Sequence, residues 1–348
     1  MVKILFWINI FTIFLGFGAY ISPYASPQSF WMFSILGLFY PWLVLANILF
    51  VFIWGVLRKR YFIYSLAWLI LGWGQFTSLV GFRTKPNHPP TDTEIRVMTF
   101  NCRNLVKPGA GTTKLTEEEI TGLINEYQPE VLCFQEFPVP RVAGPFADYI
   151  TKGTDCNHFF QDQGGQLAIF SKYPISKKRA KYYDNRSNGY LSADITVGEK
   201  VYRLFNIHLQ SNEVSKIADK VASEGKIQEK QTWLTIRGMI GKYRNSARKR
   251  ATQAKEIAEH IQRSPNPVII CGDFNDVPQS NAYHLLSKGT TDTFKKAGVG
   301  IGTTYAGSIP GLRIDYILES AGLKTLEFDI IKVNYSDHYP VFARLQPE

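Results

Sequence analysis

Hydrophobic residues are distributed unevenly along this chain, and their pattern divides it into two parts. Residues 4–21, 30–57 and 61–82 contain no Asp, Glu, Lys or Arg. Each run is close to or longer than the roughly 18–20 residues that a helix needs to cross a bilayer. The first run could instead be a signal peptide, but its apolar part is long and no small-residue cleavage site follows it. We therefore predict a membrane region, residues 1–82, with three transmembrane helices.

Cations in the short loops predict the orientation of these helices. Lys3 precedes the first run and Arg58-Lys59-Arg60 separates the second from the third, whereas residues 22–29 contain no cation. Because cytoplasmic loops are enriched in Lys and Arg, the amino terminus is expected inside. Three crossings then place everything after Phe82 on the other side. In a bacterial cell this pattern predicts an integral inner-membrane protein whose soluble part lies in the periplasm.

The rest of the chain has the mixed composition of a soluble domain and begins with a tether. Residues 83–93 contain Pro86, Pro89 and Pro90. Such a proline-rich segment is expected to be extended and to mark a domain boundary. The soluble domain is therefore predicted to occupy residues 94–348.

Short apolar runs alternate with amphipathic segments in this soluble domain. The longest helical pattern, residues 230–262, has apolar residues at spacings of three and four. Its polar face is basic, with no acid between Glu229 and Glu256, and this leaves open both a solvated face and contact with phosphate groups. Strands of both alternating and buried pattern, mixed with a few helices, predict an α/β fold of two packed sheets with helices outside. The predicted strands lie at residues 95–101, 131–136, 166–171, 190–195, 201–209, 268–271, 314–318 and 341–344.

Polar residues gather where these strands end. The buried run Val268–Cys271 leads into Gly272, Asp273 and Asn275. Such a place, at the carboxyl end of a buried strand, is where open α/β sheets usually hold their chemistry. A strand followed by an ordinary Asx turn would explain this segment alone, but the other strands end in the same way. The full set of strand-end residues is Asn101, Glu136, His208, Asp273, Asn275, Asp315, Asp337 and His338.

The residue types in this set indicate phosphate-ester chemistry. Four carboxylates, two carboxamides and two imidazoles would be costly to bury without a shared purpose. Oxygen ligands suit a hard cation such as Mg²⁺ or Mn²⁺, which stabilises a phosphoryl group. An imidazole beside a carboxylate can act as a general base or bind a phosphate oxygen. The set therefore predicts metal-assisted hydrolysis of a phosphate ester.

The order of these motifs resembles the endonuclease/exonuclease/phosphatase superfamily of deoxyribonuclease-like, metal-dependent phosphoesterases, and we interpret the chain as a membrane-anchored bacterial member. The resemblance covers about residues 94–346 and leaves the membrane region out. It implies an α/β fold, a four-layer sandwich of two mixed sheets flanked by helices, with the site at one end of the sheets. The motifs that carry it are Asn101, Gln135-Glu136, His208-Leu209, Gly272-Asp273-Phe274-Asn275, Arg313-Ile314-Asp315 and Ser336-Asp337-His338.

The resemblance also implies a role for each residue. Glu136 corresponds to the principal metal ligand, with Asn101 and Asp337 completing a site for Mg²⁺ or Mn²⁺. Asp273, aided by Asn275, corresponds to the residue that activates or orients the attacking water. The remaining members, implied to hold and contact the scissile phosphate or to act as base, are Asp315, His338 and His208.

Substrate identity is left open by these residues, because the same site serves enzymes that act on DNA, RNA, lipids and inositol phosphates. A nuclease-like phosphodiesterase and a lipid phosphodiesterase of the phospholipase C or sphingomyelinase type are both compatible with the pattern, so the expected partner is a nucleic acid or a phospholipid headgroup. A non-catalytic binding protein on the same fold is the third alternative. The net charge of +10 permits contact with phosphate-bearing partners without requiring it. The four cysteines show no zinc-binding spacing and are expected to be reduced, and the oligomeric state is not indicated.

Overall fold

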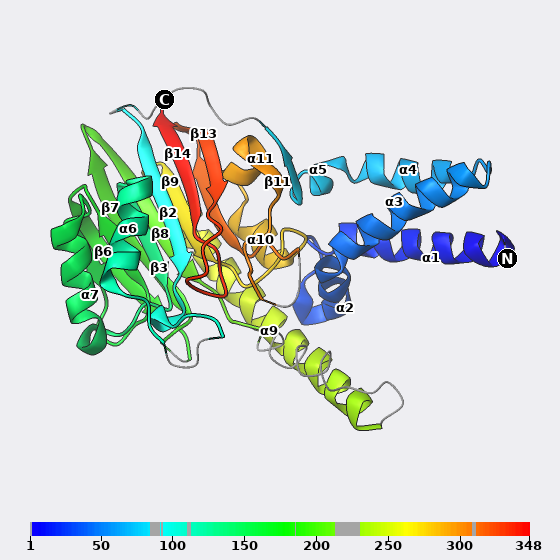
Figure 1. Ribbon diagram of the computed structural model, residues 1–348, viewed down its shortest axis with the longest axis horizontal. Coiled ribbons are helices and arrows are strands. Elements are labelled where there is room, and N and C mark those ends of the chain that lie inside the picture. The colour runs from blue at the N-terminus through cyan, green and yellow to red at the C-terminus, as the bar shows by residue number, and fades with distance from the viewer. Residues whose placement is uncertain are drawn as a thin grey trace.

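Two six-stranded mixed sheets form the body of the molecule, and helices cover their outer faces (Figure 1). This computed structural model describes residues 2–83, 91, 93–109, 113–184, 186–212, 230–307 and 311–348. The first sheet has the order β10-β12-β9-β8-β7-β6 and the second the order β13-β14-β2-β3-β5-β4. The first is built from β6 (Ile175–Tyr182), β7 (Gly189–Val197), β8 (Lys200–His208), β9 (Val268–Asp273), β10 (Thr290–Asp292) and β12 (Asp315–Ser320). The second is built from β2 (Ile95–Asn101), β3 (Val131–Gln135), β4 (His158–Gln161), β5 (Ala168–Ser171), β13 (Leu323–Ile330) and β14 (Val341–Pro347).

The hydrophobic core lies in three layers around these sheets. Fully buried side chains such as Val97, Ile169 and Leu204 pack between the two sheets. The outer face of the first sheet packs against apolar residues of α9 and α10, and that of the second against those of α6 and α7. This arrangement confirms the prediction of two mixed sheets flanked by helices. The covering helices are α6 (Glu117–Tyr127), α7 (Pro140–Gly153), α9 (Lys230–Gln262), α10 (Asn281–Leu286) and α11 (Thr293–Ala297), and a short 3₁₀ turn spans Arg103–Leu105.

Strand pairing brings the predicted site residues to one end of the sandwich. β8 and β9 are parallel, with His208 opposite Asp273. β12 runs antiparallel to β9 and places Asp315 on the other side of Asp273. In the second sheet β2 and β3 are parallel, so Asn101 lies opposite Gln135, the residue before Glu136. Parallel strands end at the same edge of a sheet, and for this reason the four strand ends meet.

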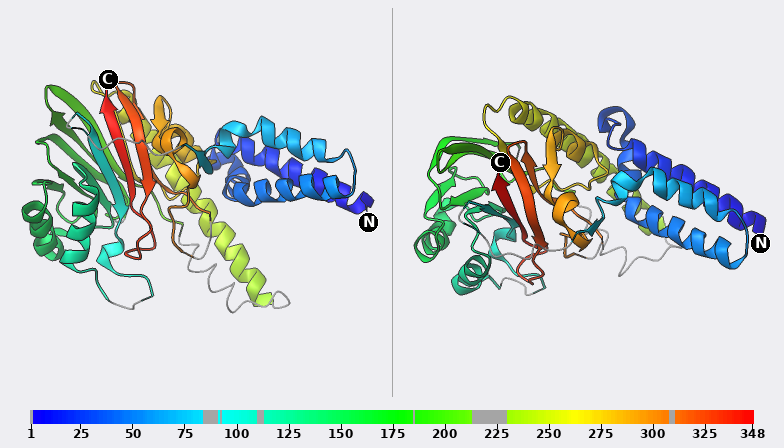
Figure 2. Two further views of the ribbon diagram at one scale, coloured as in Figure 1. Left: turned by 45° about the horizontal axis from the view of Figure 1, so that its top comes forward. Right: turned by 90° about the horizontal axis from the view of Figure 1, so that it is seen from above.

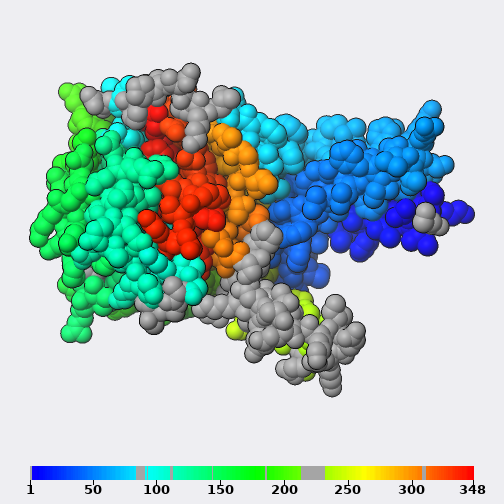
Figure 3. Space-filling view, in the orientation of Figure 1, coloured from blue at the N-terminus to red at the C-terminus, as the bar shows by residue number. Residues whose placement is uncertain are grey.

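The N-terminal helices form an arm that extends away from the sheet domain (Figures 1, 2 and 3). Its outer surface is apolar, with Ile4, Trp7 and Phe14 65–69% exposed. Its interior holds a polar network in which Asn9 donates to Ser65 and accepts from the Trp54 indole, at 2.7 and 2.9 Å. A surface more apolar than the interior is typical of helices packed in lipid. The arm contains α1 (Val2–Ile21), α2 (Pro27–Leu38), α3 (Tyr40–Val56), α4 (Phe62–Leu71) and α5 (Trp73–Phe76).

The prediction of three transmembrane helices is wrong, because the helices that form do not all have the length and hydropathy of a membrane span. Among the described residues, α1 is the one helix long and apolar enough by itself to cross a membrane. The predicted second span, residues 30–57, is broken into α2 and α3, which meet at a bend of 50° and together could form one more span. The predicted third span, residues 61–82, contains only the ten-residue helix α4, the short α5 and the strand β1 (Val80–Phe82). Pro41 at the start of α3 lacks an N–H donor and favours this break.

Close contacts join the arm to the sheet domain. β1 pairs antiparallel with β11 (Val299–Ile301) of the sheet domain. On the opposite side of the arm, α2 packs on α9, where the Tyr243 hydroxyl donates to the Ser34 carbonyl at 3.0 Å. Arg248 of α9 donates to the carbonyl oxygens of Pro27 and Gln28. The predicted tether, residues 83–93, lies mostly outside the described residues.

Candidate active site

A glycine allows β8 and β9 to approach closely where the site begins. Gly272 has φ +140°, and a Cβ atom built there would lie 1.9 Å from the carbonyl oxygen of Ile207. No side chain fits at that distance, so the residue before Asp273 must be glycine for the two strands to stay paired. The Gly272-Asp273 sequence therefore places a carboxylate directly beside the end of β8.

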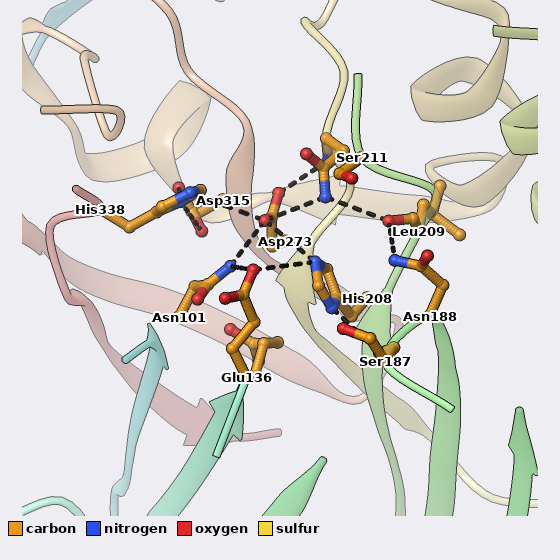
Figure 4. Close-up of polar contacts among 12 residues, drawn as sticks. Asn101, Glu136, Ser187, Asn188, His208, Leu209, Ser211, Asp273, Asp315 and His338 are labelled. Carbon is orange, nitrogen blue, oxygen red and sulfur yellow. Dashed lines mark hydrogen bonds and ion pairs between the residues drawn. The ribbon is translucent and has the colours of Figure 1, made fainter. Parts of the chain in front are cut away.

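Asp273 is the centre of the polar cluster (Figure 4). Its Oδ2 accepts from Asn101 Nδ2 at 3.0 Å and from Asn275 Nδ2 at 3.1 Å, and its Oδ1 accepts from the Asn275 backbone N–H at 2.7 Å. The Nε2 atoms of His208 and His338 lie 3.5 and 3.8 Å from the same Oδ2. Burial raises the pKa of Asp273 above its ordinary value, and the two imidazoles oppose that rise. Five of the predicted residues thus meet at one carboxylate.

The Asx turn considered from the sequence is also present. The Asp273 carboxylate accepts from the N–H two residues later, and Asn275 adopts a left-handed backbone with φ 52°. Asparagine tolerates this region better than most residues because its short side chain bonds locally. The turn directs Asn275 Nδ2 to both Asp273 and the Leu209 carbonyl. The turn and the site are therefore the same structure.

His338 and Asp315 form a buried pair. His338 Nδ1 lies 3.0 and 3.1 Å from the two Asp315 oxygens. Burial alone would lower the pKa of His338, but the carboxylates of Asp315 and Asp273 outweigh it and raise the pKa to about 10. The ring of Tyr305 packs edge-on against His338 at 5.4 Å between centroids. Asp315 therefore fixes the orientation of the imidazole and leaves Nε2 facing Asp273.

Glu136 and His208 complete the opposite side of the cluster (Figure 4). Glu136 follows β3 in a left-handed backbone conformation, φ 51°, which is uncommon for a residue other than glycine. Its Oε1 accepts from Asn101 Nδ2 at 3.3 Å and lies 3.9 Å from His208 Nε2. His208 Nδ1 is 3.0 Å from the Ser187 carbonyl oxygen, and its buried Nε2 lacks a hydrogen-bond partner among the described residues. Two carboxylates and two imidazole nitrogens therefore share one small space.

Asp337 is the predicted site residue that the structure leaves apart from the others. No hydrogen bond or ion pair in the described part of the chain joins it to Glu136 or Asn101. Its Oδ2 instead lies 3.7 Å from Arg103 Nε, and its side chain is 33% exposed. It flanks the site because it immediately precedes His338.

The donor atoms fit a hard divalent cation. Glu136 and Asp337 offer carboxylate oxygens, which Mg²⁺ and Mn²⁺ prefer. The Asn101 amide oxygen accepts from the Arg103 backbone N–H at 3.2 Å, so it would have to turn toward Glu136 to join them. The side chain of Glu136 is 29% exposed, so one face of this carboxylate is accessible from solvent.

A second group of possible ligands lies deeper. One donor atom from each of Asp273, Asp315 and His338 falls within 4.8 Å of the others, and all three residues are buried. The hydrogen bond between His338 Nδ1 and Asp315 already uses one ring nitrogen of this group. The accessible Glu136 carboxylate and this deeper group are therefore both possible ligands of a cation.

Buried ion pairs behind the site went unnoticed in the sequence. Arg250 belongs to the basic segment of residues 230–262, but it is fully buried and its Nε donates to Asp276 at 2.9 Å. Its spacing from the buried Ala247 and Ala254 could have signalled this. Arg313 is likewise buried and pairs with Asp292 at 2.7 Å. For Arg313 and Asp292, 21 residues apart, no local pattern indicates the pairing.

Comparison with known proteins agrees with this geometry. The Endonuclease/Exonuclease/phosphatase family matches residues 98–338, more than half of the chain, and the chain belongs to this family. A domain of unknown function matches residues 2–79. No curated protein matches the chain.

Solved structures with the same fold cover most of the sheet domain. A humanized D. rerio TDP2 superposes with a TM-score of 0.53 at 17% identity, covering 73% of this chain and 99% of that one. The human Nocturnin catalytic domain has a TM-score of 0.51 at 16% identity, covering 78% and 97%. An endonuclease/exonuclease/phosphatase from Bacteroides vulgatus has a TM-score of 0.52 at 16% identity, covering 74% and 100%. At these identities the similarity establishes the fold.

Proposed function

We propose that this chain is a membrane-anchored, divalent-cation-dependent phosphodiesterase. The observation that carries the proposal is the convergence of His208 Nε2 and His338 Nε2 on Asp273 Oδ2, at 3.5 and 3.8 Å, beside the Glu136 carboxylate. A buried cluster of carboxylates and imidazoles is costly to fold unless it serves binding or chemistry. Membership of the phosphoesterase-containing family supports the same reaction class.

The cation would be held by Glu136, Asn101 and Asp337. It supplies positive charge that stabilises the negative charge developing on the phosphoryl group. Asn101 also donates to Glu136 and to Asp273, so its amide holds the two carboxylates at fixed positions. We assign Asp337 to this set from the family resemblance, and its place at the edge of the site would let it approach a bound ion by side-chain rotation.

The remaining residues would act on the attacking water and the phosphate. Asp273, held by the two donors of Asn275, orients or deprotonates the water. His338, held at Nδ1 by Asp315, presents Nε2 to the phosphate, and His208, held at Nδ1 by the Ser187 carbonyl, presents the other Nε2. Positioned groups of this kind contribute about 10²–10⁴-fold each to a reaction rate.

Membrane anchorage is supported by the composition and shape of the arm. Its surface is apolar, its buried network is polar, and α1 has the length and hydropathy of a spanning helix. Lys3 and the turn between α3 and α4, which contains Arg58-Lys59-Arg60, both lie at the end of the arm far from the sheet domain (Figure 1). By the positive-inside rule this end is cytoplasmic. We therefore propose that the sheet domain faces the non-cytoplasmic side, which in a bacterial cell is the periplasm.

Nucleic acid is the proposed substrate class, with a phospholipid headgroup as the second candidate. One structure of the same fold is D. rerio TDP2 complexed with a single-strand DNA product, at 17% identity and a TM-score of 0.51. The lipid candidate is favoured by the apolar cluster in which Leu38 and Trp42 of the arm pack with Ile314 and Tyr305, neighbours of Asp315 and His338. Hydrolysis of single-stranded DNA, RNA and phospholipid vesicles by the full-length protein would separate the two.

Glu136→Gln tests the metal proposal. Gln keeps the size of Glu but removes the charge that a hard ion requires, so Mg²⁺ or Mn²⁺ affinity and turnover of bis(p-nitrophenyl) phosphate should both fall. The matched control is Glu126→Gln on α6, an exposed position in the sheet domain. Calorimetric titration of the ion into both variants makes the measurement. Equal metal affinity in wild type and Glu136→Gln would refute the ligand assignment, and absence of metal-dependent turnover in the wild type would favour a non-catalytic binding protein.

A further inference from the structure

A cavity of about 760 Å³ lies at the junction of the arm and the sheet domain. Tyr20 and Tyr24, at the end of α1, line it together with Gln75 from α5. The opposite wall comes from α10 and α11 of the sheet domain. None of the eight proposed site residues lines this cavity, so it is separate from the active site.

The sheet-domain side of the cavity is positively charged. Lys295 and Lys296 of α11 both line it, and both are exposed. Neither forms an ion pair with a carboxylate elsewhere in the described residues. Two adjacent ammonium groups at the edge of a cavity favour an anionic ligand such as a phosphate group.

Two buried acceptors in the wall lack hydrogen-bond donors. Gln279 is 1% exposed, and its amide nitrogen donates to Ser78 Oγ at 2.8 Å. Its Oε1 is buried without a partner among the described residues, and so is Oε1 of Gln75. Leaving a buried acceptor unpaired costs about 1–3 kcal/mol. Both residues line the cavity, so rotation of either amide would present its unpaired oxygen to a ligand that carries hydroxyl or ammonium groups.

The cavity lies where the apolar surface of the arm ends. Leu71 also lines it and is 73% exposed, and Tyr24 is 71% exposed. Trp73, two residues after Leu71, is 56% exposed. Tyr and Trp gather at the depth of lipid headgroups in membrane proteins. A ligand in this cavity would therefore have its polar part against the sheet domain and its apolar part along the helices.

We propose that this cavity binds the headgroup of a glycerophospholipid from the surrounding bilayer. The phosphate lies against Lys295 and Lys296, and rotation of the Gln279 or Gln75 amide would let its Oε1 accept from a hydroxyl or ammonium group of the headgroup. Cavities of about 300–1,000 Å³ hold small-molecule ligands, so a headgroup fits while its acyl chains remain on the apolar face of the arm. The proposal rests on the proposed membrane anchorage and is independent of hydrolysis at the active site.

The test is lipid binding by the full-length protein in detergent. Dioctanoyl-phosphatidylglycerol and glycerol 3-phosphate are titrated separately, and bound ligand is counted by native mass spectrometry. The double variant Lys295→Gln with Lys296→Gln should bind the lipid about thirtyfold more weakly, since each of the two cations near an anionic lipid is worth about 1 kcal/mol and about 1.4 kcal/mol is a tenfold change. The control is Lys178→Gln with Lys324→Gln, which removes the same charge from exposed strand positions outside the cavity.

A second variant tests the cavity itself. Gly74 lines it, and a Cβ atom there meets nothing within 4 Å, so Gly74→Trp should fill part of the space and reduce lipid binding without disturbing the fold. Equal lipid affinity in the cavity variants and the control would overturn the proposal. Glycerol 3-phosphate binding as tightly as the lipid would also overturn it, in favour of a soluble phosphate ligand. His338→Ala should bind lipid normally, whereas failure of the wild type to float with liposomes would disprove the anchorage instead.

Discussion

The end of the sandwich and the interior of the arm both bury polar side chains, but they do so in opposite ways. In the arm, Asn9, Ser65 and Trp54 are neutral and hydrogen-bond to one another. At the end of the sandwich the buried groups are ionisable, and His208 Nε2 has no hydrogen-bond partner among the described residues. A neutral network whose donors meet acceptors holds helices together. A charged cluster with an unused nitrogen is organised to receive a ligand.

The outer surfaces of the two regions also differ in polarity. The arm exposes large apolar side chains such as Trp7 and Phe14, at 67% and 69%. The exposed residues of β6 in the sheet domain are all polar: Ser176, Lys177, Lys178, Arg179 and Lys181. The second surface is suited to water, and the first is suited to an apolar environment. The difference shows that burial of a polar residue has functional meaning only when its charge, its partners and the surrounding solvent are considered together.

The largest effect is expected from removing an ionisable group of the site. His338→Ala should reduce turnover of bis(p-nitrophenyl) phosphate by about 10²–10⁴-fold, because the imidazole that faces Asp273 is lost. Affinity for Mg²⁺ should change little, since His338 is not a proposed ligand. The matched control is His158→Ala on the edge strand β4, where the side chain is exposed. Normal turnover in His338→Ala would remove the basis of the catalytic proposal.

The next largest effect is expected from breaking a buried ion pair of the sheet domain that lies next to the arm. Arg313 pairs with Asp292 and also donates to the carbonyl of Ser78, next to the arm, at 3.2 Å. Arg313→Leu leaves Asp292 buried with an uncompensated charge, and this should destabilise the protein by about 3–5 kcal/mol. Chemical denaturation in detergent measures it. Adding Asp292→Asn to the variant should recover part of the loss, and if it does not, the charge pair is not the cause.

Removing a neutral polar group inside the arm should have a smaller effect on stability and no effect on the rate of catalysis. Asn47 accepts from the Ser65 hydroxyl at 2.9 Å inside the arm. Asn47→Leu removes this hydrogen bond, and polar contacts between helices in lipid are worth about 0.6–2 kcal/mol. Thermal unfolding should shift accordingly while kcat stays at the wild-type value. A large fall in kcat would show that the interior of the arm is coupled to the active site.

The smallest effect is expected at Glu319, a carboxylate that belongs to neither buried cluster. Replacing it should change only the pH dependence of stability. Burial raises the pKa of Glu319 from 4.5 to about 7, although the Thr325 hydroxyl and Lys296 oppose it. Because the folded-state pKa is the higher one, the stabilisation is complete below pH 4.5 and is lost as pH rises through about 7. Between pH 5 and pH 8.5 the Tm of the wild type should therefore fall more than that of Glu319→Gln, by on the order of a few degrees. If the change in Tm between pH 5 and pH 8.5 were the same in wild type and in Glu319→Gln, the raised pKa of Glu319 would be disproved.

Local patterns were sufficient for the elements that hold the site. Thr116 and Glu119, three residues apart, are a capping-box pattern, and the structure contains both of its hydrogen bonds at the start of α6. The apolar runs at residues 190–195 and 201–209 form the antiparallel pair β7 and β8. The polar residues at strand ends can be found from the sequence, because each apolar run that predicts a strand is followed directly by a polar residue. Seven of the eight candidate residues meet as expected, and Asp337 stays at the edge.

The amino-acid sequence by itself determined which residues are apolar, where the strands end and which polar side chains lie at those ends, because these depend on near neighbours in the chain. Only the tertiary structure decided that Arg250 is buried against Asp276 and that a cavity opens between the arm and α11. Each of these depends on contacts between segments far apart in sequence. The free energy of such a contact depends on which surfaces meet, and the local pattern of residues does not contain that information.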